Sequence, residues 1–346
     1  MPDISRRDML KWLAAGLGVL GGGWFLRACG LRPERTPVPP RPTGTPVPPT
    51  ALPTAAPTPP PGEPTPTPAP TATPTATPLP IPDLAVARGG EPAALVRRAV
   101  AALGGMERFV RPGDDVIVKP NICVAYHGYE YAATTNPWVV SELVRLCLEA
   151  GAGRVRVMDS PFGGSAEQAY AISGIREQVE AAGGTMEIMT SFKFVPADMS
   201  MALDLRSCDI YEDVLNADVV ISVPIAKHHN LARLTLGMKN LMGVIRDRPA
   251  IHRNVGQRLA DLTARIRPAL TVVDAVRILT ANGPTGGNLA DVRQLDTIIA
   301  SPDIVAADAF AGTLFGLRPD ELEYVRAAAA MGLGRMDLEG LRIAEV

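Results

Sequence analysis

Short runs of apolar, often β-branched residues alternate with segments of helical periodicity between residues 83 and 346. Most of the runs hold apolar residues at consecutive positions, which is typical of strands whose two faces are both buried in a parallel sheet. The runs lie at residues 115–118, 154–158, 219–223, 270–273 and 297–300. The pattern predicts an α/β fold, a mostly parallel sheet with helices on both faces, in one body or in two joined lobes.

Capping side chains that precede prolines predict where two of the helices begin. Asn136-Pro137 and Ser301-Pro302 each place a hydrogen-bonding side chain before a proline at the first helical position. Gly151 predicts the end of the first of these helices. A further helix after the strand 219–223 is indicated by apolar residues at helical spacing, namely Leu234, Met238, Leu241, Met242 and Ile245.

The first 82 residues differ in composition from the rest of the chain. The segment SRRDMLK at residues 5–11 matches the twin-arginine export pattern, and an uncharged stretch follows at 12–26. This stretch is shorter than the roughly 20 residues of a membrane-spanning helix, so residues 1–30 predict a twin-arginine signal peptide. An internal amphipathic helix is the alternative. Cys29 follows a sequence similar to a lipoprotein cleavage box, although Arg27 is unusual there; a retained or ordinarily cleaved signal is the alternative to lipidation.

Residues 31–82 are dominated by proline, threonine and alanine. Such a composition buries almost no apolar surface and favours extended polyproline conformations, so it predicts a disordered stalk before the folded part at 83–346. Together the two segments predict a protein that the twin-arginine translocation machinery exports. Its expected location is extracytoplasmic, at the cell surface or in the periplasm, with Cys29 as a lipid anchor if it is modified.

Charge and cysteine spacing exclude several classes of function. The net charge is −2, and no basic patch with interleaved aromatic residues is present, so nucleic-acid binding is not expected. Cys123, Cys147 and Cys208 are never at CxxC spacing, which argues against a zinc knuckle or an iron–sulfur cluster. Cys147 lies at a core position of the helix after Pro137.

Polar residues gather directly after four of the predicted strands. Binding crevices of open parallel sheets lie at the carboxyl ends of the strands, so these residues are expected to share one site. Singly, Asp159 could cap a helix, Asp274 could orient a turn and Lys119 could be a solvated charge. As a group they predict a binding site for a small anionic molecule, formed by Lys119, Asn121, Asp159, Lys227, His228, His229 and Asp274. Gly163 and Gly164 could add backbone N–H groups for the anion, or could simply form a glycine-rich loop.

Histidine and lysine supply the candidate chemistry. The chain holds only four histidines, and three of them lie within residues 228–252. Imidazole suits both proton transfer and metal coordination, so His228 and His229 are candidate catalytic groups, and His229 with His252 is a candidate metal pair. Lys239, if desolvated on the apolar face, could lose its proton near neutral pH and act as a base or nucleophile, with Asn240 beside it and Asp159 as a further catalytic group.

The folded part resembles the family named domain of unknown function 362. The resemblance rests on five blocks in order: VIVKPNI, TTNPWVVSELVRLCLEAGAGRVRVMDSP, ADVVISVPIAKHHNLARLTLGMKNLMGVI, LTVVDAV with NGPTGG, and IIASPDIVAADAFAG. The family is defined by sequence and its reaction is not established. Many members carry ferredoxin-type cysteine clusters, and this chain lacks them, so the resemblance implies no iron–sulfur cluster here.

A fainter resemblance concerns lactate racemase apoproteins that carry a nickel-pincer cofactor. Those proteins have a histidine, a cofactor-bearing lysine ten residues later and a further histidine, an order that His229, Lys239 and His252 reproduce. The resemblance implies a metal ion or a lysine-linked nickel cofactor. We therefore expect a metal- or cofactor-dependent enzyme of the racemase, isomerase or oxidoreductase type that acts on a small anion. The alternative is a surface-tethered protein that binds an anion without converting it.

Overall fold

The computed structural model describes residues 80–346. The predicted signal peptide, Cys29 and most of the predicted stalk lie outside these residues. The described residues belong to one compact unit. None of the helices in this part combines the length and apolar character needed to cross a membrane.

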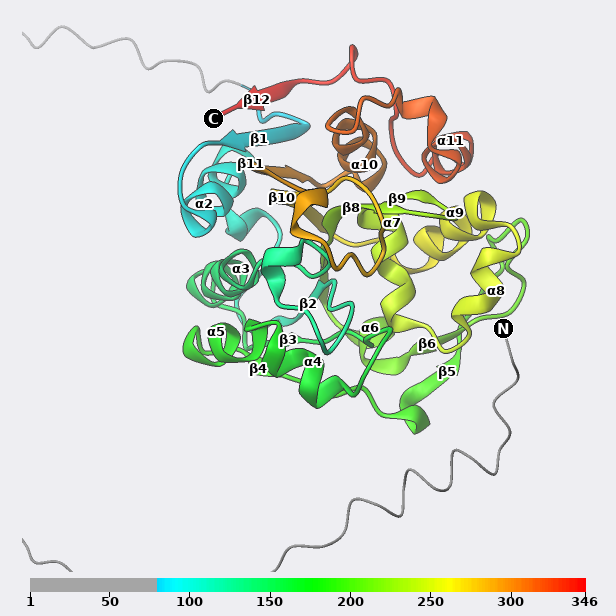
Figure 1. Cartoon of the computed structure of the whole chain (residues 1–346), viewed down its shortest axis with the longest axis horizontal. Helices are drawn as coiled ribbons and strands as arrows, with labels where there is room; N and C mark the ends of the chain where they lie inside the picture. Colours follow the sequence, from blue (N-terminus) through cyan, green and yellow to red (C-terminus); the bar gives the residue numbers. More distant parts are fainter. Residues whose placement is uncertain (1–79) are drawn as a thin grey trace, which may run out of the picture. The chain divides into compact units, whose positions relative to one another are not determined.

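A large sheet runs through the described part, as Figure 1 shows. It contains ten strands. Its strands are β1 (Leu84–Arg88), β2 (Asp115–Pro120), β3 (Arg154–Val157), β4 (Thr185–Met186), β7 (Val219–Val223), β8 (Ile225–His229), β9 (Arg233–Thr235), β10 (Leu270–Leu279), β11 (Val292–Ser301) and β12 (Ile343–Glu345). The order is β12-β1-β11-β10-β7-β2-β3-β4, with β8 pairing β10 and β9. The neighbours from β10 to β4 are parallel, whereas β11 is antiparallel to both β1 and β10. A separate pair is formed by β5 (Phe194–Pro196) and β6 (Asp209–Tyr211).

Helices cover both faces of the sheet, as the sequence predicts. They are α2 (Pro92–Ala102), α3 (Pro137–Glu149), α4 (Ala166–Ile172), α5 (Ile175–Ala181), α6 (Glu212–Asn216), α7 (Gly237–Asn240), α8 (Arg248–His252), α9 (Val255–Ile266), α10 (Ile304–Thr313) and α11 (Glu323–Ala330). Alternate strand residues point to opposite faces, so β2 gives Val116 and Val118 to the core under α2, α3 and α5, and gives Ile117 to the core with α9, α10 and α11. These two cores explain why β2 is apolar at consecutive positions from Val116 to Val118.

The predicted helix boundaries are confirmed in α3 and corrected in α10. The side chain of Asn136 accepts a hydrogen bond from the backbone of Trp138, and α3 ends just before Gly151, which has a φ of +94°. Ser301 does not cap α10, because it is still paired with the neighbouring strand as the last residue of β11. The cap is Asp303, two residues later, whose carboxylate accepts the first free N–H groups of that helix.

The segment after β7 also differs from its predicted form. Instead of one helix, the chain makes β8 and β9, then α7, and then a 3₁₀ turn at Leu241–Val244. Leu234 therefore lies in a strand, although it is buried as its apolar spacing suggests. The consequence is a short, fully buried helix that carries Lys239 and Asn240 to the carboxyl edge of the sheet.

Candidate functional site

A cavity of about 400 Å³ opens where the parallel strands end. Its volume is in the range of sites that hold small molecules. The loops after β2 and β3, strand β8 and the segment from α7 to α8 form its walls. The predicted site residues that line it are Asn121, Asp159, Lys227, His229, Lys239, Asn240 and His252. Seven of the predicted residues thus lie around one cavity, whereas Lys119, His228 and Asp274 do not line it.

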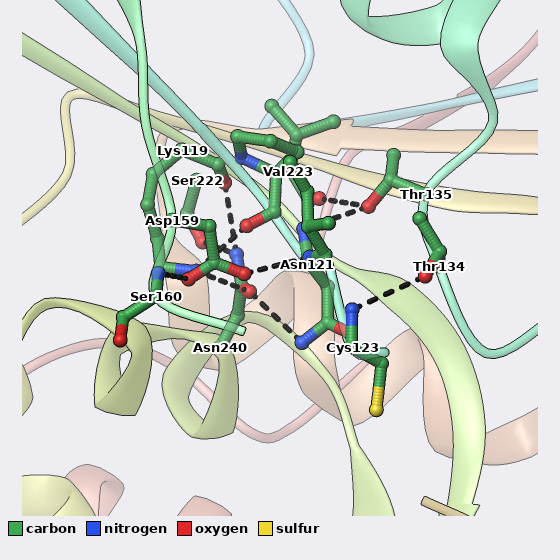
Figure 2. A network of polar contacts seen from close by, with 12 residues as sticks. Lys119, Asn121, Cys123, Thr134, Thr135, Asp159, Ser160, Ser222, Val223 and Asn240 are labelled. Carbon is green, nitrogen blue, oxygen red and sulfur yellow. Dashed lines mark hydrogen bonds and ion pairs between the residues drawn. The ribbon is translucent and has the colours of Figure 1, made fainter. Parts of the chain in front are cut away.

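Lys119 lies beneath the cavity in a closed polar network, shown in Figure 2. Its Nζ donates to Asp159 Oδ1 at 2.8 Å, to Asn240 Oδ1 at 2.8 Å and to the backbone oxygen of Pro120 at 2.6 Å. An ammonium has three hydrogens, and these acceptors use all of them. Because only 1% of Lys119 is exposed, it fixes the floor of the cavity and has no donor left for a ligand.

Asp159 is held equally firmly. Its Oδ2 accepts from the backbone N–H of Ile122 at 2.6 Å, and its Oδ1 also accepts from the N–H of Ser160 at 2.9 Å. A side chain at Gly243 would collide with the Asp159 carboxylate and the Lys119 ammonium. The absence of a Cβ at residue 243 therefore lets the backbone pass close to this ion pair.

Lys227 is a second saturated lysine. Its Nζ donates to Asn121 Oδ1 at 2.9 Å, to the backbone oxygen of Ala133 at 2.6 Å and to that of Pro284 at 2.9 Å. It ties together the loop after β2 and the loop after β10. The positive charge remains in the wall of the cavity, but its hydrogens are committed to the protein.

Lys239 differs from both. Within residues 80–346 its amine has no hydrogen-bond or ion-pair partner, although only 8% of the residue is exposed. Burial, reinforced by the positive charges of Lys227 and Arg248, lowers the pKa of Lys239 from 10.5 to about 7. A substantial fraction of this amine is therefore unprotonated at neutral pH and open to the cavity.

Asp308 on α10 positions the helix that carries Lys239. Its two carboxylate oxygens accept from the backbone N–H groups of Gly237 at 2.6 Å and Met238 at 2.9 Å, the first residues of α7. Burial raises the pKa of Asp308 to about 7. Nothing in the sequence marked this aspartate, because it lies inside an apolar helix far along the chain.

The adjacent histidines occupy opposite faces of β8. Lys227 and His229 point to the cavity, whereas His228 points away and its Nδ1 accepts from the N–H of Gly283 at 3.2 Å. His229 Nδ1 accepts from the N–H groups of Leu231 at 3.1 Å and Ala232 at 3.3 Å. The ring proton of neutral His229 must therefore be on Nε2. Burial and the nearby lysines lower the pKa of His229 to about 3, so the ring is neutral and donates one N–H toward the cavity.

Arg248 is a cavity residue that sequence reasoning missed. It begins α8, and its guanidinium donates to the backbone oxygen of Ser160 at 2.6 Å. Within residues 80–346 it forms no ion pair, so its charge is available to an anion. Its position after a short turn gave no periodic signal in the sequence.

Besides Lys119 and His228, three more of the predicted binding residues lie outside the cavity lining. Asp274 is fully buried and accepts from the N–H groups of Asn136 at 2.7 Å and Val276 at 3.0 Å. Burial raises the pKa of Asp274 to about 6. The N–H of Gly163 donates to the backbone oxygen of Cys123, and Gly164 packs against Ala125. Asp274 thus anchors the start of α3, and the two glycines shape a loop behind the cavity wall.

A family model described as a domain of unknown function (DUF362) matches residues 116–313. The chain belongs to the DUF362 family. It is also 30% identical over 254 residues to a thylakoid-associated protein, sll1697, of Synechocystis sp., an alignment that covers 70% of this chain and 76% of that protein.

Two solved structures overlap with this DUF362 domain in part. The lactate racemase apoprotein from Thermoanaerobacterium thermosaccharolyticum gives a TM-score of 0.39 at 10% identity, covering 64% of this chain and 56% of its own. A structural-genomics protein from Thermotoga maritima gives a TM-score of 0.37 at 14% identity, covering 66% of this chain and 60% of its own. The chain therefore spans less than two thirds of either structure.

The DUF362 cavity does not offer a complete ligand set for a metal ion. The rings of His229 and His252 are 6.0 Å apart between centroids, and no group of three or more histidine, cysteine, aspartate or glutamate side chains in the described residues could hold a metal. His229 is also unsuited to coordination, because Nδ1 is occupied and Nε2 carries the proton. A group linked covalently through an amine fits better, because Lys239 has no partner within residues 80–346 and an unprotonated fraction.

Proposed function

We propose that this protein is an enzyme that moves a proton on a small hydroxy- or oxo-carboxylate bound in the 400 Å³ cavity. The observation that carries the proposal is the Lys239 amine, which is buried, has no partner within residues 80–346 and has a pKa of about 7. A base with a pKa near the working pH combines a large active fraction with useful basicity. Lys119 and Lys227, whose hydrogens are all engaged, serve to shape the site.

The other roles follow from which donors remain free. Arg248 is the cation that can pair with the carboxylate of the substrate, since it has no acidic partner in the described residues. The Nε2–H of His229 can donate to an oxygen on which negative charge develops. Lys239 takes the proton from the carbon. If a cofactor is joined to Lys239, as the nickel-pincer resemblance implies, it would supply an electron sink or hydride acceptor beside these same groups.

The test does not require the natural substrate. The full chain, purified from its native host, is incubated in D₂O with a panel of small 2-hydroxy- and 2-oxo-carboxylates, and loss of each C–H signal is followed by proton NMR. We expect exchange with at least one compound and its loss in Lys239→Ala. The control is Lys193→Ala, since Lys193 pairs with Asp213 outside the cavity. Intact mass and elemental analysis of the same sample show whether an adduct or metal is present.

Binding without exchange would refute the proposal. If a carboxylate binds saturably, and Arg248→Gln weakens that binding while no compound exchanges its proton, the protein is a non-catalytic anion-binding protein.

We also propose that the chain is exported by the twin-arginine route and acts outside the cytoplasm. The segment at residues 5–11 supports this proposal, and it agrees with the thylakoid association named for the relative sll1697. Replacing Arg6 and Arg7 by lysine should retain the protein in the cytoplasm, as measured by cell fractionation. Unchanged export would overturn it.

A further inference from the structure

A second cavity, of about 580 Å³, lies where α2 and α3 begin against strands β10 and β11. Figure 1 shows these two helices side by side on one face of the sheet. This cavity shares no lining residue with the first one. Nothing in the proposed reaction uses it.

A buried amide points a free donor group into this cavity. Asn136 is only 3% exposed, and its Oδ1 accepts from the backbone N–H of Trp138 at 3.0 Å. That bond fixes which end of the amide is oxygen, so Nδ2 is the end left over. Within residues 80–346, Nδ2 has no acceptor, and Asn136 lines the cavity. This donor is therefore free to bind an acceptor that enters the cavity, either solvent or a ligand.

Two further donors lie in the same walls. Arg277, from β10, places its guanidinium 5.5 Å from the centroid of the Tyr129 ring and forms no hydrogen bond or ion pair within residues 80–346. Helix α2 begins with Pro92, and Glu91 at its N-cap does not cap it with its side chain, which leaves the N–H of Ala93 at the cavity wall. An amide, a guanidinium and an uncapped helix start together suit one anionic group.

The remaining walls are aromatic and acidic. Trp138 meets Tyr129 edge to face at 5.2 Å between centroids, and 40% of Trp138 is exposed. Glu91 and Asp296 also line the cavity. A purely anionic ligand would be repelled by these carboxylates, whereas a flat ring with amino donors could stack on Trp138 and pair with them.

We propose that this cavity binds a small amino-substituted aromatic compound that carries a phosphate or carboxylate, such as a nucleoside monophosphate. The anionic group lies against Asn136, Arg277 and the start of α2, and the ring lies against Trp138. The site is separate from the Lys239 cavity, so its ligand regulates or accompanies the reaction and does not undergo it.

Tryptophan fluorescence tests this proposal directly. The chain contains Trp12, Trp24 and Trp138, so the full-length Trp12→Phe/Trp24→Phe variant reports from the cavity alone. It is titrated with adenosine monophosphate, adenosine and inorganic phosphate. We expect saturable quenching by the monophosphate, and binding weaker by about tenfold or more for adenosine or phosphate alone, because each lacks one half of the contacts.

The matched variants are Arg277→Gln and Arg293→Gln. Arg293 is exposed on the neighbouring strand and donates to the backbone oxygen of Leu314, outside the cavity. We expect Arg277→Gln to weaken binding of the monophosphate by about tenfold. Arg293→Gln should leave that binding unchanged, and the two variants should unfold at the same temperature. A carboxylate-bearing aromatic, 4-aminobenzoate, is the second arm. The proposal would be overturned by any of three results. These are no quenching by either adenosine monophosphate or 4-aminobenzoate, equal binding of the monophosphate by Arg277→Gln and the unmodified cavity, or binding of phosphate as tight as that of the monophosphate.

Discussion

The pKa of Lys239 decides whether the first cavity can do proton chemistry at neutral pH. Burial of this amine, reinforced by the nearby charges of Lys227 and Arg248, lowers its pKa from 10.5 to about 7, and no acceptor within residues 80–346 offsets the effect. At pH 7 about half of the Lys239 amine is then unprotonated, whereas an ordinary lysine is unprotonated in only about one molecule in three thousand.

This difference is measurable by labelling amines at low extent with isotopic acetic anhydride between pH 5 and pH 11, at pH values set about half a unit apart. The acetylation of each lysine is read from peptide masses. Only the unprotonated amine reacts, so the rate at Lys239 should reach half of its plateau near pH 7. Lys193 is the internal control, because its ion pair with Asp213 raises its pKa above the usual value. Its labelling should still be rising at the most alkaline point.

The Arg248→Gln variant separates the effect of burial on the pKa of Lys239 from the effect of the nearby charge. Removing this cation should move the midpoint of Lys239 to higher pH, because one of the charges that oppose protonation is gone. Arg206→Gln, outside the cavity lining, should leave the midpoint unchanged. A wild-type midpoint above about 9, close to that of an exposed lysine, would refute the reasoning and remove the base from the proposed reaction.

Three further predictions concern stability, each measured by urea unfolding. The folded pKa of Lys239 lies below its unfolded value, so this amine binds a proton more readily in the unfolded chain between about pH 7 and pH 10.5. It should contribute a rise in stability of up to about 5 kcal/mol across that window, and Lys239→Met should remove that contribution. Gly243→Ala should cost about 1–3 kcal/mol, because the added methyl group meets the Asp159 carboxylate, whereas Gly340→Ala should be near neutral. Asp308→Ala should cost about 3 kcal/mol by leaving two buried N–H groups of α7 unpaired, and it should also shift the labelling profile of Lys239; an unchanged profile would show that Asp308 does not position α7.

The fold could be predicted from the sequence because strands that are buried on both faces form recognisable apolar runs. Strands β2, β3 and β7 begin where the apolar runs begin, and Cys147 is fully buried as expected. The hairpin of β8 and β9 was not predicted, because it is short and its apolar residues also fit a helical repeat. The local spacing of apolar residues cannot distinguish a short hairpin from a helix when packing against other elements decides which of them forms.

The location of the site could be predicted from the sequence, whereas the roles of its residues could be predicted less well. The residues that follow parallel strands meet at one edge, so Asn121, Asp159 and Lys227 could be grouped from the sequence alone. Which hydrogens remain free could not be predicted, because that depends on acceptors such as the backbone oxygen of Pro284, more than fifty residues from Lys227. The His228 side chain points away from the cavity because side chains alternate along β8, and the sequence had not predicted this strand.

The contrast between the three buried lysines explains how one cavity can be both rigid and reactive. Lys119 and Lys227 each give all their hydrogens to protein acceptors, and those contacts fix Asn121, Asp159 and Asn240 around the floor. Their hydrogens are committed to these acceptors, so neither offers a free amine to a ligand. Lys239, on a helix held by Asp308, lies near the charge of Lys227 but shares none of these acceptors, so its amine is the one open to the cavity. Adding a carboxylate partner to Lys239 would stabilise its charge and the fold together, and would end the reactivity that the unpaired amine provides.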